Sequence, residues 1–255
     1  MSDSTDIEGI ERATLAAVPP QSQETWNDWL LAYDDGTVGR CHSAVPIRHG
    51  SPRPDAFHEI ASRYEVAGRP LVLRLPEVPT FDSFRHELIG RGWMRATPTS
   101  VQIAEIPTAA TRLPVEIAEV PDAHWQAAFL GEGTGAADGA SRLAILRRGQ
   151  NSIFATVRVD GQVAAVGYAC ISHAWCGVHG MRTVSDYRRK GHASAILARL
   201  AEVSRERGVT RWFLQVEQAN VPALRLYRRW GFQPAWSYAY WRRGLGEITC
   251  SQVRP

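Results

Sequence analysis

The sequence lacks the features that mark several classes of protein. It has no run of about 18 apolar residues, so we expect no membrane-spanning helix. The segment from Met1 to Gly9 is acidic and polar and does not resemble a signal peptide. The net charge of +3 is small and gives no electrostatic footprint of a nucleic-acid-binding protein. These absences favour a cytoplasmic protein without membrane or nucleic-acid partners.

Cysteine is scarce, and its spacing does not favour a metal site. The four cysteines form no CxxC pair. Two cysteines and two histidines recur at every third position: Cys170, His173, Cys176 and His179. This spacing suits one face of a helix, but the local residues predict strands, in which these side chains alternate between faces. We therefore expect no metal and interpret Cys170 and Cys176 as reduced, buried thiols.

The chain divides into two parts with a similar order of elements. Its 44% hydrophobic and 22% charged residues exclude a disordered protein and suffice for one large or two small domains. A stretch rich in Pro, Thr and Ala at 107–114 marks a boundary, so we expect domains at 1–110 and 111–255. Each part shows a hairpin with an Asp-Gly turn, a helix, a strand, a helix that ends in Gly-aromatic, and a strand. This order predicts a duplicated α/β (α+β) fold.

Periodicity and turn signals place the individual elements. In the first part we expect helices at 7–18, 57–64 and 81–89, the last capped by Thr80, and strands at 29–33, 38–45, 71–75 and 100–106. In the second part we expect helices at 122–130, 142–148, 193–203 and 220–231, and strands at 152–159, 163–171, 176–184, 212–216 and 236–241. A small, glycine-rich loop is expected at 131–139.

The clearest chemical signal is the segment from Thr183 to Ser194, which follows a strand and opens a helix. Gly191 lets the backbone approach a ligand closely. The first N–H groups of a helix have no partner within it, and with the helix dipole they form an anion site suited to a pyrophosphate. Three adjoining cations add positive charge: Arg188, Arg189 and Lys190.

Two motifs in this part resemble those of the GNAT superfamily of N-acetyltransferases. Arg188-x-x-Gly191-x-Ala193 is similar to the family's Arg/Gln-x-x-Gly-x-Gly/Ala loop, which holds the pyrophosphate of coenzyme A. After one more strand, the segment from Asn220 to Phe232 matches the family's Asn-x-x-Ala-x-x-x-Tyr-x-x-x-Gly-Phe signature. The resemblance covers about half of the chain. It implies a mixed, mostly antiparallel twisted sheet flanked by helices.

The resemblance also implies acetyl-CoA as the acyl donor and assigns residues to it. The backbone of Met181, Arg182 and Thr183 would pair with the pantetheine arm. The pyrophosphate would lie on the loop residues Arg188, Arg189, Lys190, Gly191, His192, Ala193 and Ser194. Asn220 would orient the cofactor near the thioester, and Tyr227 would protonate the leaving thiolate. Taken singly, Gly191, Asn220 and Tyr227 suit a helix start, an N-cap and a core aromatic; their joint spacing favours the chemical roles.

The group that accepts the proton of the amine is left open. His179 falls where many family members carry a strand glutamate, and a histidine there can titrate near neutrality. It could equally be a strand histidine that only forms hydrogen bonds. Glu217 is a second candidate, against the alternative of an exposed charge at a strand end. His192 is expected to face solvent.

The first part lacks a phosphate loop. Ser51-Pro-Arg-Pro-Asp55 stands at the corresponding place, and its two prolines remove two N–H donors. This part loosely resembles the degenerate first half of tandem GNAT proteins, through segments 29–36 and 40–43. We expect it to bind no coenzyme A, to pack against the second half and to shape the acceptor cleft.

The expected activity is direct transfer of an acetyl group from acetyl-CoA to a primary amine in a ternary complex. A small-molecule acceptor is favoured over a protein. The alternative is a non-catalytic acyl-CoA sensor or pseudoenzyme, although the Asn220 and Tyr227 pair favours catalysis. A dinucleotide-binding domain is excluded because the loop has no G-x-G-x-x-G run. The oligomeric state is left open, with a homodimer among the alternatives.

Overall fold

The fold is taken from a computed structural model, which describes residues 6–244. Its α-helices are α1 (Ile7–Ala17), α2 (Ala56–Val66), α3 (Asp82–Gly90), α4 (Ala123–Leu130), α5 (Ala136–Arg148), α6 (His192–Glu206) and α7 (Val221–Arg229). Short 3-10 helices are η1 (Gly39–His42), η2 (Pro79–Phe81) and η3 (Ser185–Tyr187). The strands are β1 (Ser22–Trp26), β2 (Trp29–Tyr33), β3 (Ala44–Pro46), β4 (Leu73–Pro76), β5 (Trp93–Glu105), β6 (Glu116–Ala118), β7 (Ser152–Val159), β8 (Gln162–Ser172), β9 (Trp175–Thr183), β10 (Arg211–Glu217) and β11 (Gln233–Arg243).

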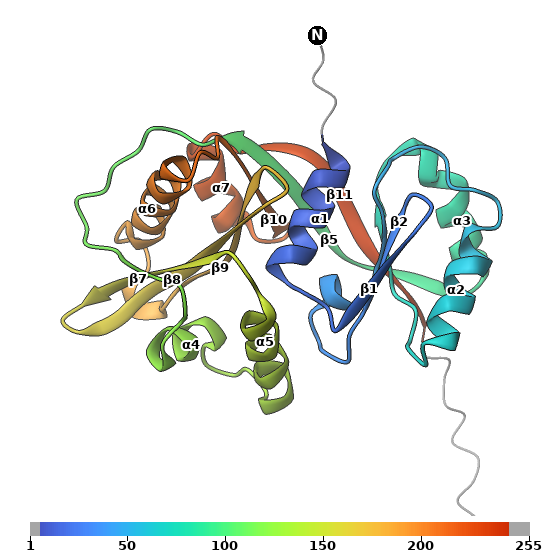
Figure 1. Ribbon diagram of the computed structural model, residues 1–255, viewed down its shortest axis with the longest axis horizontal. Helices are drawn as coiled ribbons and strands as arrows, with labels where there is room; N and C mark the ends of the chain where they lie inside the picture. The colour runs from blue at the N-terminus through green and yellow to red at the C-terminus, as the bar shows by residue number, and fades with distance from the viewer. Residues whose placement is uncertain (1–5, 245–255) are drawn as a thin grey trace, which may run out of the picture.

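Both halves of the chain contribute to one sheet (Figure 1). Its 11 described strands follow the order β1-β2-β3-β4-β11-β5-β10-β9-β8-β7-β6. Two pairs of strands are parallel, β3 with β4 and β9 with β10, and the other pairs are antiparallel. In each parallel pair a helix, α2 or α6, makes the crossover, as parallel strands require. The expected mixed, mostly antiparallel sheet flanked by helices is confirmed.

The two halves exchange their last strands at the centre of the sheet. Strand β11, from the second half, lies between β4 and β5 of the first half. Strand β5 in turn lies between β11 and β10, so both of its neighbours come after residue 110. The expected boundary at residue 110 therefore divides the chain into two halves, but strands from both halves pair in one continuous sheet. That boundary stays a prediction.

Helix α1 connects the two halves across one face of the sheet (Figure 1). It begins at Asp6, whose carboxylate accepts a hydrogen bond from the backbone N–H of Gly9 at 2.8 Å. It ends before Pro19 and Pro20, which cannot continue a helix. Ile10 packs with the central strands of the sheet, and Leu15 packs with β2 and β3.

A buried ion pair fixes α1 to the sheet. Glu11 of α1 and Arg74 of β4 are 1% and 0% exposed, and their side chains are 2.6 Å apart. The Arg74 guanidinium also lies 5.0 Å from the centre of the Tyr238 ring. Burial raises the pKa of Glu11, although Arg74 opposes the shift. Removal of one partner would leave the other charge buried without compensation.

The predicted elements of the second half agree with the structure more closely than those of the first. The strand at 152–159 and the helix at 122–130 are confirmed within a residue. The loop expected at 131–139 is shorter, because α5 already starts at Ala136. The strand predicted at 38–45 was wrong over its first half: η1 occupies Gly39–His42, and the strand β3 is confined to Ala44–Pro46.

The hairpin expected across Asp35-Gly36 is confirmed in its antiparallel pairing of β2 with β3, but η1 makes the connection longer than a tight turn. A further hairpin, between β1 and β2, closes around Asn27 and Asp28 and was not predicted. One capping prediction was wrong. Thr80 does not cap α3, because its hydroxyl donates to the carbonyl of His49 at 2.6 Å.

The sequence predicts no membrane-spanning helix and no metal site, and both expectations can be compared with residues 6–244. Over that range no helix is long and apolar enough to cross a bilayer. The same residues contain no group of three or more side chains that could hold a metal ion. Cys41, Cys170 and Cys176 are free and buried, and Cys250 lies outside the described residues.

The buried ion pair gives a prediction for stability. Glu11→Gln should lower the free energy of unfolding by about 3 kcal/mol, because it leaves the Arg74 guanidinium without a counter-charge in the core. Urea unfolding measures the effect. The control is Glu8→Gln on the same helix, which breaks the solvent-exposed pair with Arg12 and should cost less than about 1 kcal/mol. Equal losses in the two variants would contradict this account.

Candidate active site

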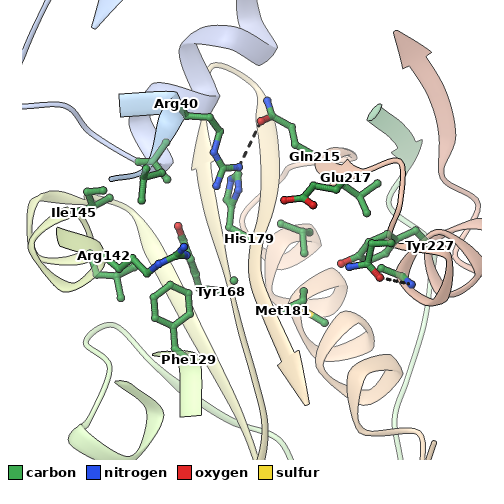
Figure 2. A pocket seen from close by; sticks show the side chains of 18 residues that line it. Arg40, Phe129, Arg142, Ile145, Tyr168, His179, Met181, Gln215, Glu217 and Tyr227 are labelled. Atoms are coloured by element: carbon green, nitrogen blue, oxygen red, sulfur yellow. Dashed lines mark hydrogen bonds between the residues drawn. The ribbon is translucent and has the colours of Figure 1, made fainter. Parts of the chain in front are cut away.

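A cleft opens where two neighbouring strands separate. β9 and β10 pair in parallel over three positions, which end at Val178 and Leu214. Beyond them β9 continues along β8, and β10 continues along β5. Residues 179–183 therefore have no strand partner on the side of β10. Between the separated strands lies a cavity of about 450 Å³ (Figure 2).

A β-bulge coincides with the separation. Gly180 and Met181 of β9 stand opposite the single residue Gly167 of β8. Gly180 has a φ of +61°, and a Cβ there would lie 2.9 Å from the rings of Phe129 and Tyr168. Glycine is therefore required at position 180 both for its backbone angle and for space. Bulges of this kind bend a strand locally and are common beside active sites.

The cavity brings together five of the residues expected from the sequence. They come from β9, β10 and α7 and are His179, Met181, Glu217, Asn220 and Tyr227. The other expected residues, from Arg182 to Ser194, lie outside its lining, at the end of β9 and the start of α6.

The start of α6 leaves its first N–H groups unpaired. Gly191 is the N-cap, with a φ of +85° and no hydrogen bond from a capping side chain. The first intrahelical bond runs from Ala195 N–H to the Gly191 carbonyl at 3.0 Å. The N–H groups of residues 192–194 have no partner among the described residues. Nothing lies within 4 Å of a Cβ built on Gly191, so the approach to this turn is open.

Positive charge surrounds this turn. Arg188, Arg189 and Lys190 are exposed, and Arg189 adopts a φ of +63°. Arg182 is occupied elsewhere: its guanidinium donates to the carbonyls of Phe129 and Leu130 at the end of α4. Only the backbone of Arg182 is thus available to a ligand that lies along β9.

His192 does not face solvent as expected. Its side chain is buried and packs edge-on against the ring of Tyr187. The reason is that His192, the first residue of α6, lies on the buried side of that helix. His192 therefore contributes to the loop through its contact with Tyr187.

Asn220 and Tyr227 belong to the same helix. The Asn220 side chain accepts a hydrogen bond from Ala223 N–H at 3.2 Å and so acts as the N-cap of α7. Tyr227 lies nearly two turns further along and is 8% exposed, at the wall of the cavity. Burial raises the pKa of its phenol to about 12. The phenol therefore keeps its proton throughout the physiological pH range.

His179 lies in an apolar environment. Its ring packs 5.3 Å from the ring of Tyr168 and 5.7 Å from that of Phe213, and neither ring nitrogen has a hydrogen-bond partner among the described residues. Burial, with Arg40 nearby, lowers its pKa well below the ordinary value of 6.5. The expectation that His179 titrates near neutrality was wrong, because the imidazolium form is desolvated here.

Glu217 differs from His179 in its surroundings. Its side chain is exposed at the end of β10 and lines the cavity. Figure 2 shows its carboxylate pointing into the space between His179 and Tyr227. The carboxylate has no hydrogen bond or ion pair among the described side chains.

Two parts of the chain that the sequence did not assign complete the cleft. Arg40 of η1 and Val18 after α1 come from the first half. Arg142 and Ile145 of α5 form the wall beside them (Figure 2). The sequence signal for Arg40 was misleading, because its apolar neighbours suggested a strand. The bulge glycine, Gly180, could have been suspected from its place inside an apolar strand.

Comparison with known proteins agrees with this geometry. Residues 4–241 match the family described as "Probable histone acetyltransferase Rv0428c C-terminal". The chain belongs to this family. It is a GNAT-type acetyltransferase, as the two motifs indicated.

Individual relatives support the same assignment. The uncharacterised N-acetyltransferase YobR of Bacillus subtilis (strain 168) is 23% identical over 92% of this chain and 98% of its own length. The streptothricin acetyltransferase of Streptomyces lavendulae is 34% identical over 83 residues, which cover 31% of this chain and 43% of that protein.

Solved structures extend the likeness to both halves. A GCN5-related N-acetyltransferase from Kribbella flavida has a TM-score of 0.67 and 20% identity, over 97% of this chain and 98% of its own. A tandem GNAT protein from the clavulanic acid biosynthesis pathway has a TM-score of 0.55 and 14% identity, over 94% and 95%. The expected tandem arrangement is therefore supported, with the exchanged central strands as the feature that joins the halves.

The burial of His179 gives a prediction for pH dependence. Because its pKa is lowered on folding, the unfolded chain binds a proton below pH 6.5 that the folded chain excludes. This group stabilises the fold fully above pH 6.5, and its effect is lost as the pH falls, by about 1.4 kcal/mol per pH unit. The His179→Phe variant should lack this part of the dependence of the unfolding free energy on pH. Urea unfolding from pH 7 down to about pH 5 measures the slope.

Phe213→Leu is the matched control for this slope. It disturbs the same cluster but removes no titrating group, so it should lower stability equally at every pH. A His179→Phe slope identical to that of the unaltered protein would show that folding does not lower the pKa of His179.

Proposed function

We propose that this acetyltransferase uses acetyl-CoA and transfers its acetyl group to the primary amine of a small molecule, by direct transfer in a ternary complex. The observation that carries the proposal is the cleft between β9 and β10. A phenol and a free carboxylate lie in its walls, and beyond its lining β9 leads to the open, uncapped start of α6.

The residues present suit coenzyme A. The unpaired N–H groups at the start of α6 and the three exposed cations before it match a diphosphate. The free side of β9 at 179–183 offers backbone groups to an amide-containing arm, as a strand would. Met181, Arg182 and Thr183 would act through their backbone, and Asn220 would hold the start of α7 beside the reacting end.

Acetyl-CoA would supply an activated thioester, and the chain would supply proton transfers and a place for developing negative charge. As the amine nitrogen bonds to the acetyl carbon and the carbon–sulfur bond breaks, the phenol of Tyr227 donates its proton to the sulfur. The pKa of about 12 leaves the phenol protonated until that moment. A thiolate in the same pocket is also disfavoured by desolvation, which promotes the transfer.

We assign Glu217 as the base that accepts the proton of the amine. Its carboxylate faces the cavity without a partner, whereas His179 is buried and its pKa is lowered. An ionised carboxylate can accept the proton directly or through one water molecule. We assign His179 to the wall of the cleft. A backbone N–H group on the free side of β9, at or beside the bulge, is the donor that we assign to the oxyanion.

The size and shape of the cleft favour a small acceptor. Its volume of about 450 Å³ lies in the range of small-molecule sites. Walls from α5, η1 and the segment after α1 close it on the side of the acceptor. The streptothricin acetyltransferase is named for a small molecule, whereas the family description names histone, so a lysine-containing peptide is the competing acceptor. Cytoplasmic location and homodimer formation stay predictions.

Release of free thiol from acetyl-CoA, measured with a panel of small primary amines and a lysine-containing peptide, tests this function. Small amines should be turned over with the higher kcat/KM. Tyr227→Phe should lower kcat by about two orders of magnitude, within the range for general acid catalysis. The KM for acetyl-CoA should change little, because the phenol contributes to the transition state rather than to binding.

The control is Tyr33→Phe, the same change at a phenol that donates to Glu24 in the first half and is not among the residues that line the cleft. It should leave kcat unaltered. Equal rates for Tyr227→Phe and the unaltered protein would remove Tyr227 from the acid role. Binding of acetyl-CoA without turnover of any acceptor would favour an acyl-CoA sensor.

The loop at α6 gives a separate prediction for binding. Gly191→Ala should weaken coenzyme A binding at least about tenfold, which corresponds to 1.4 kcal/mol. Alanine is strained at a φ of +85° and places a methyl group where the diphosphate would approach. Isothermal titration with coenzyme A measures the change.

Gly208→Ala is the matched variant at the other end of α6. Gly208 has a φ of +78° with equally open surroundings, so its loss of stability should resemble that of Gly191→Ala. Its affinity for coenzyme A should be unaltered. If both variants bound as tightly as the unaltered protein, the start of α6 would not be the diphosphate site.

A further inference from the structure

Arg40 is a cation in the cleft that none of the proposed steps uses. It belongs to η1 in the first half and lines the same cavity as Glu217 and Tyr227. Figure 2 shows its guanidinium entering the cavity on the side opposite Tyr227, next to His179. The side chain is half-buried.

The donors of Arg40 are largely unused. A guanidinium carries five N–H donors. Among the described residues one hydrogen bond is formed, from Nη1 to the side-chain oxygen of Gln215, at the long distance of 3.4 Å. That oxygen also accepts a bond from the Tyr238 hydroxyl at 3.0 Å. Gln215 is therefore a weak and shared acceptor for a full positive charge.

No carboxylate within the described part of the chain forms an ion pair with Arg40. The positive charge of Arg40 also acts weakly on Glu11, but that carboxylate is already held by Arg74 at 2.6 Å. The charged side chains that line the cavity are Arg40, Glu217 and Arg142, and Arg142 is paired with Asp138 at 2.9 Å. The wall at Arg40 therefore holds a guanidinium that has no ion-pair partner among the described residues. A cation partly removed from water without a counter-charge is costly, so this wall favours an anion from outside the chain.

The backbone around Arg40 is held on both sides. Gly39 packs so closely on Tyr240 that a Cβ would lie 2.8 Å from its ring. Cys41 is fully buried, and its thiol donates to the carbonyl of Val18 at 3.2 Å. These contacts fix η1 and direct Arg40 into the cavity, which is the preorganisation that a binding residue needs.

We propose that Arg40 binds a carboxylate of the acceptor, so that the substrate is an amine that also carries a carboxylate. This inference rests on the proposed acetyl transfer. One unpaired guanidinium matches one monoanionic, planar group, to which it can form two parallel hydrogen bonds. Glu217, whose carboxylate points into the space between His179 and Tyr227, would repel that carboxylate and attract the amine.

The opposite charges of Arg40 and Glu217 therefore orient the acceptor. Its carboxylate lies toward η1, and its amine lies toward Glu217 and Tyr227, where the acetyl group would be transferred (Figure 2). The first half of the chain, which has no phosphate loop of its own, acts here as the part that selects the acceptor.

The test compares amines that differ only in the anionic group. Glycine, β-alanine, 4-aminobutyrate and L-glutamate are each measured against the corresponding amide in the thiol-release assay. For the unaltered protein at least one carboxylate should have a kcat/KM at least about tenfold above that of its amide. Arg40→Met should raise the KM for that carboxylate at least tenfold, keep kcat within threefold and leave the amide unaffected. Arg40→Lys keeps the charge but not the paired donors. Its KM for the carboxylate should lie between the values for the unaltered protein and Arg40→Met.

Arg12→Met is the control, since Arg12 is a surface residue of α1 paired with Glu8, and it should change neither constant. Equal kcat/KM values for every carboxylate and its amide in the unaltered protein would overturn the inference. An Arg40→Met variant in which kcat/KM falls equally for the carboxylate and for its amide would also overturn it. Preference for 2-aminoethylphosphonate over every carboxylate would also overturn it.

A binding measurement separates failure of this inference from failure of the proposed function. Titration of each amine into the protein saturated with coenzyme A needs no turnover. If no thiol is released from any amine, the acetyl transfer proposed here is wrong, yet tighter binding of a carboxylate than of its amide, lost in Arg40→Met, would still support the role of Arg40. Equal binding of the two would contradict it.

Discussion

The architecture of the site depends on the point at which β9 and β10 stop pairing. Parallel hydrogen bonds join the strands as far as Val178 and Leu214, and then each strand follows a different neighbour. The bulge at Gly180 bends β9 at this point, and the exchanged strand β5 holds β10 in its own direction. Because the strands separate inside a continuous sheet, they leave unpaired backbone groups in an otherwise buried layer, and the cleft follows from that separation.

The same constraint explains why the first half is needed although it lacks a phosphate loop. At the N-terminus of α2, the carboxylate of Asp55 is paired with Arg53 and accepts no hydrogen bond from the first N–H groups of the helix. That this half binds no coenzyme A stays a prediction. The first half contributes β5 to the sheet beside β10, α1 across the face, and η1 to the wall of the cleft.

The sequence predicted the second half well because its signals are local. Alternating apolar residues define β7, β8 and β9, and an asparagine followed by a proline defines the start of α7. The exchange of β5 and β11 could not be predicted, since strand order depends on contacts between residues more than a hundred positions apart. The role of Arg40 was hidden for the same reason: its short, irregular segment is shaped by Tyr240 and Val18, which are distant in sequence.

The chemical roles show a similar division. The phosphate loop and the Asn220 and Tyr227 signature depend on fixed spacing along a helix start, which sequence reveals directly. The choice between His179 and Glu217 depends on burial, which lowers the pKa of His179 and leaves Glu217 exposed to the cavity. Burial is a property of the folded chain, so the two candidates could be separated only once the structure was known.

A crystal structure of the protein with acetyl-CoA tests the central claim most directly. The account predicts that the diphosphate lies on the N–H groups of residues 192–194, that the pantetheine arm runs along β9 between the separated strands, and that the sulfur lies within hydrogen-bonding distance of the Tyr227 hydroxyl. A diphosphate bound away from α6, or a Tyr227 hydroxyl directed away from the sulfur, would contradict it.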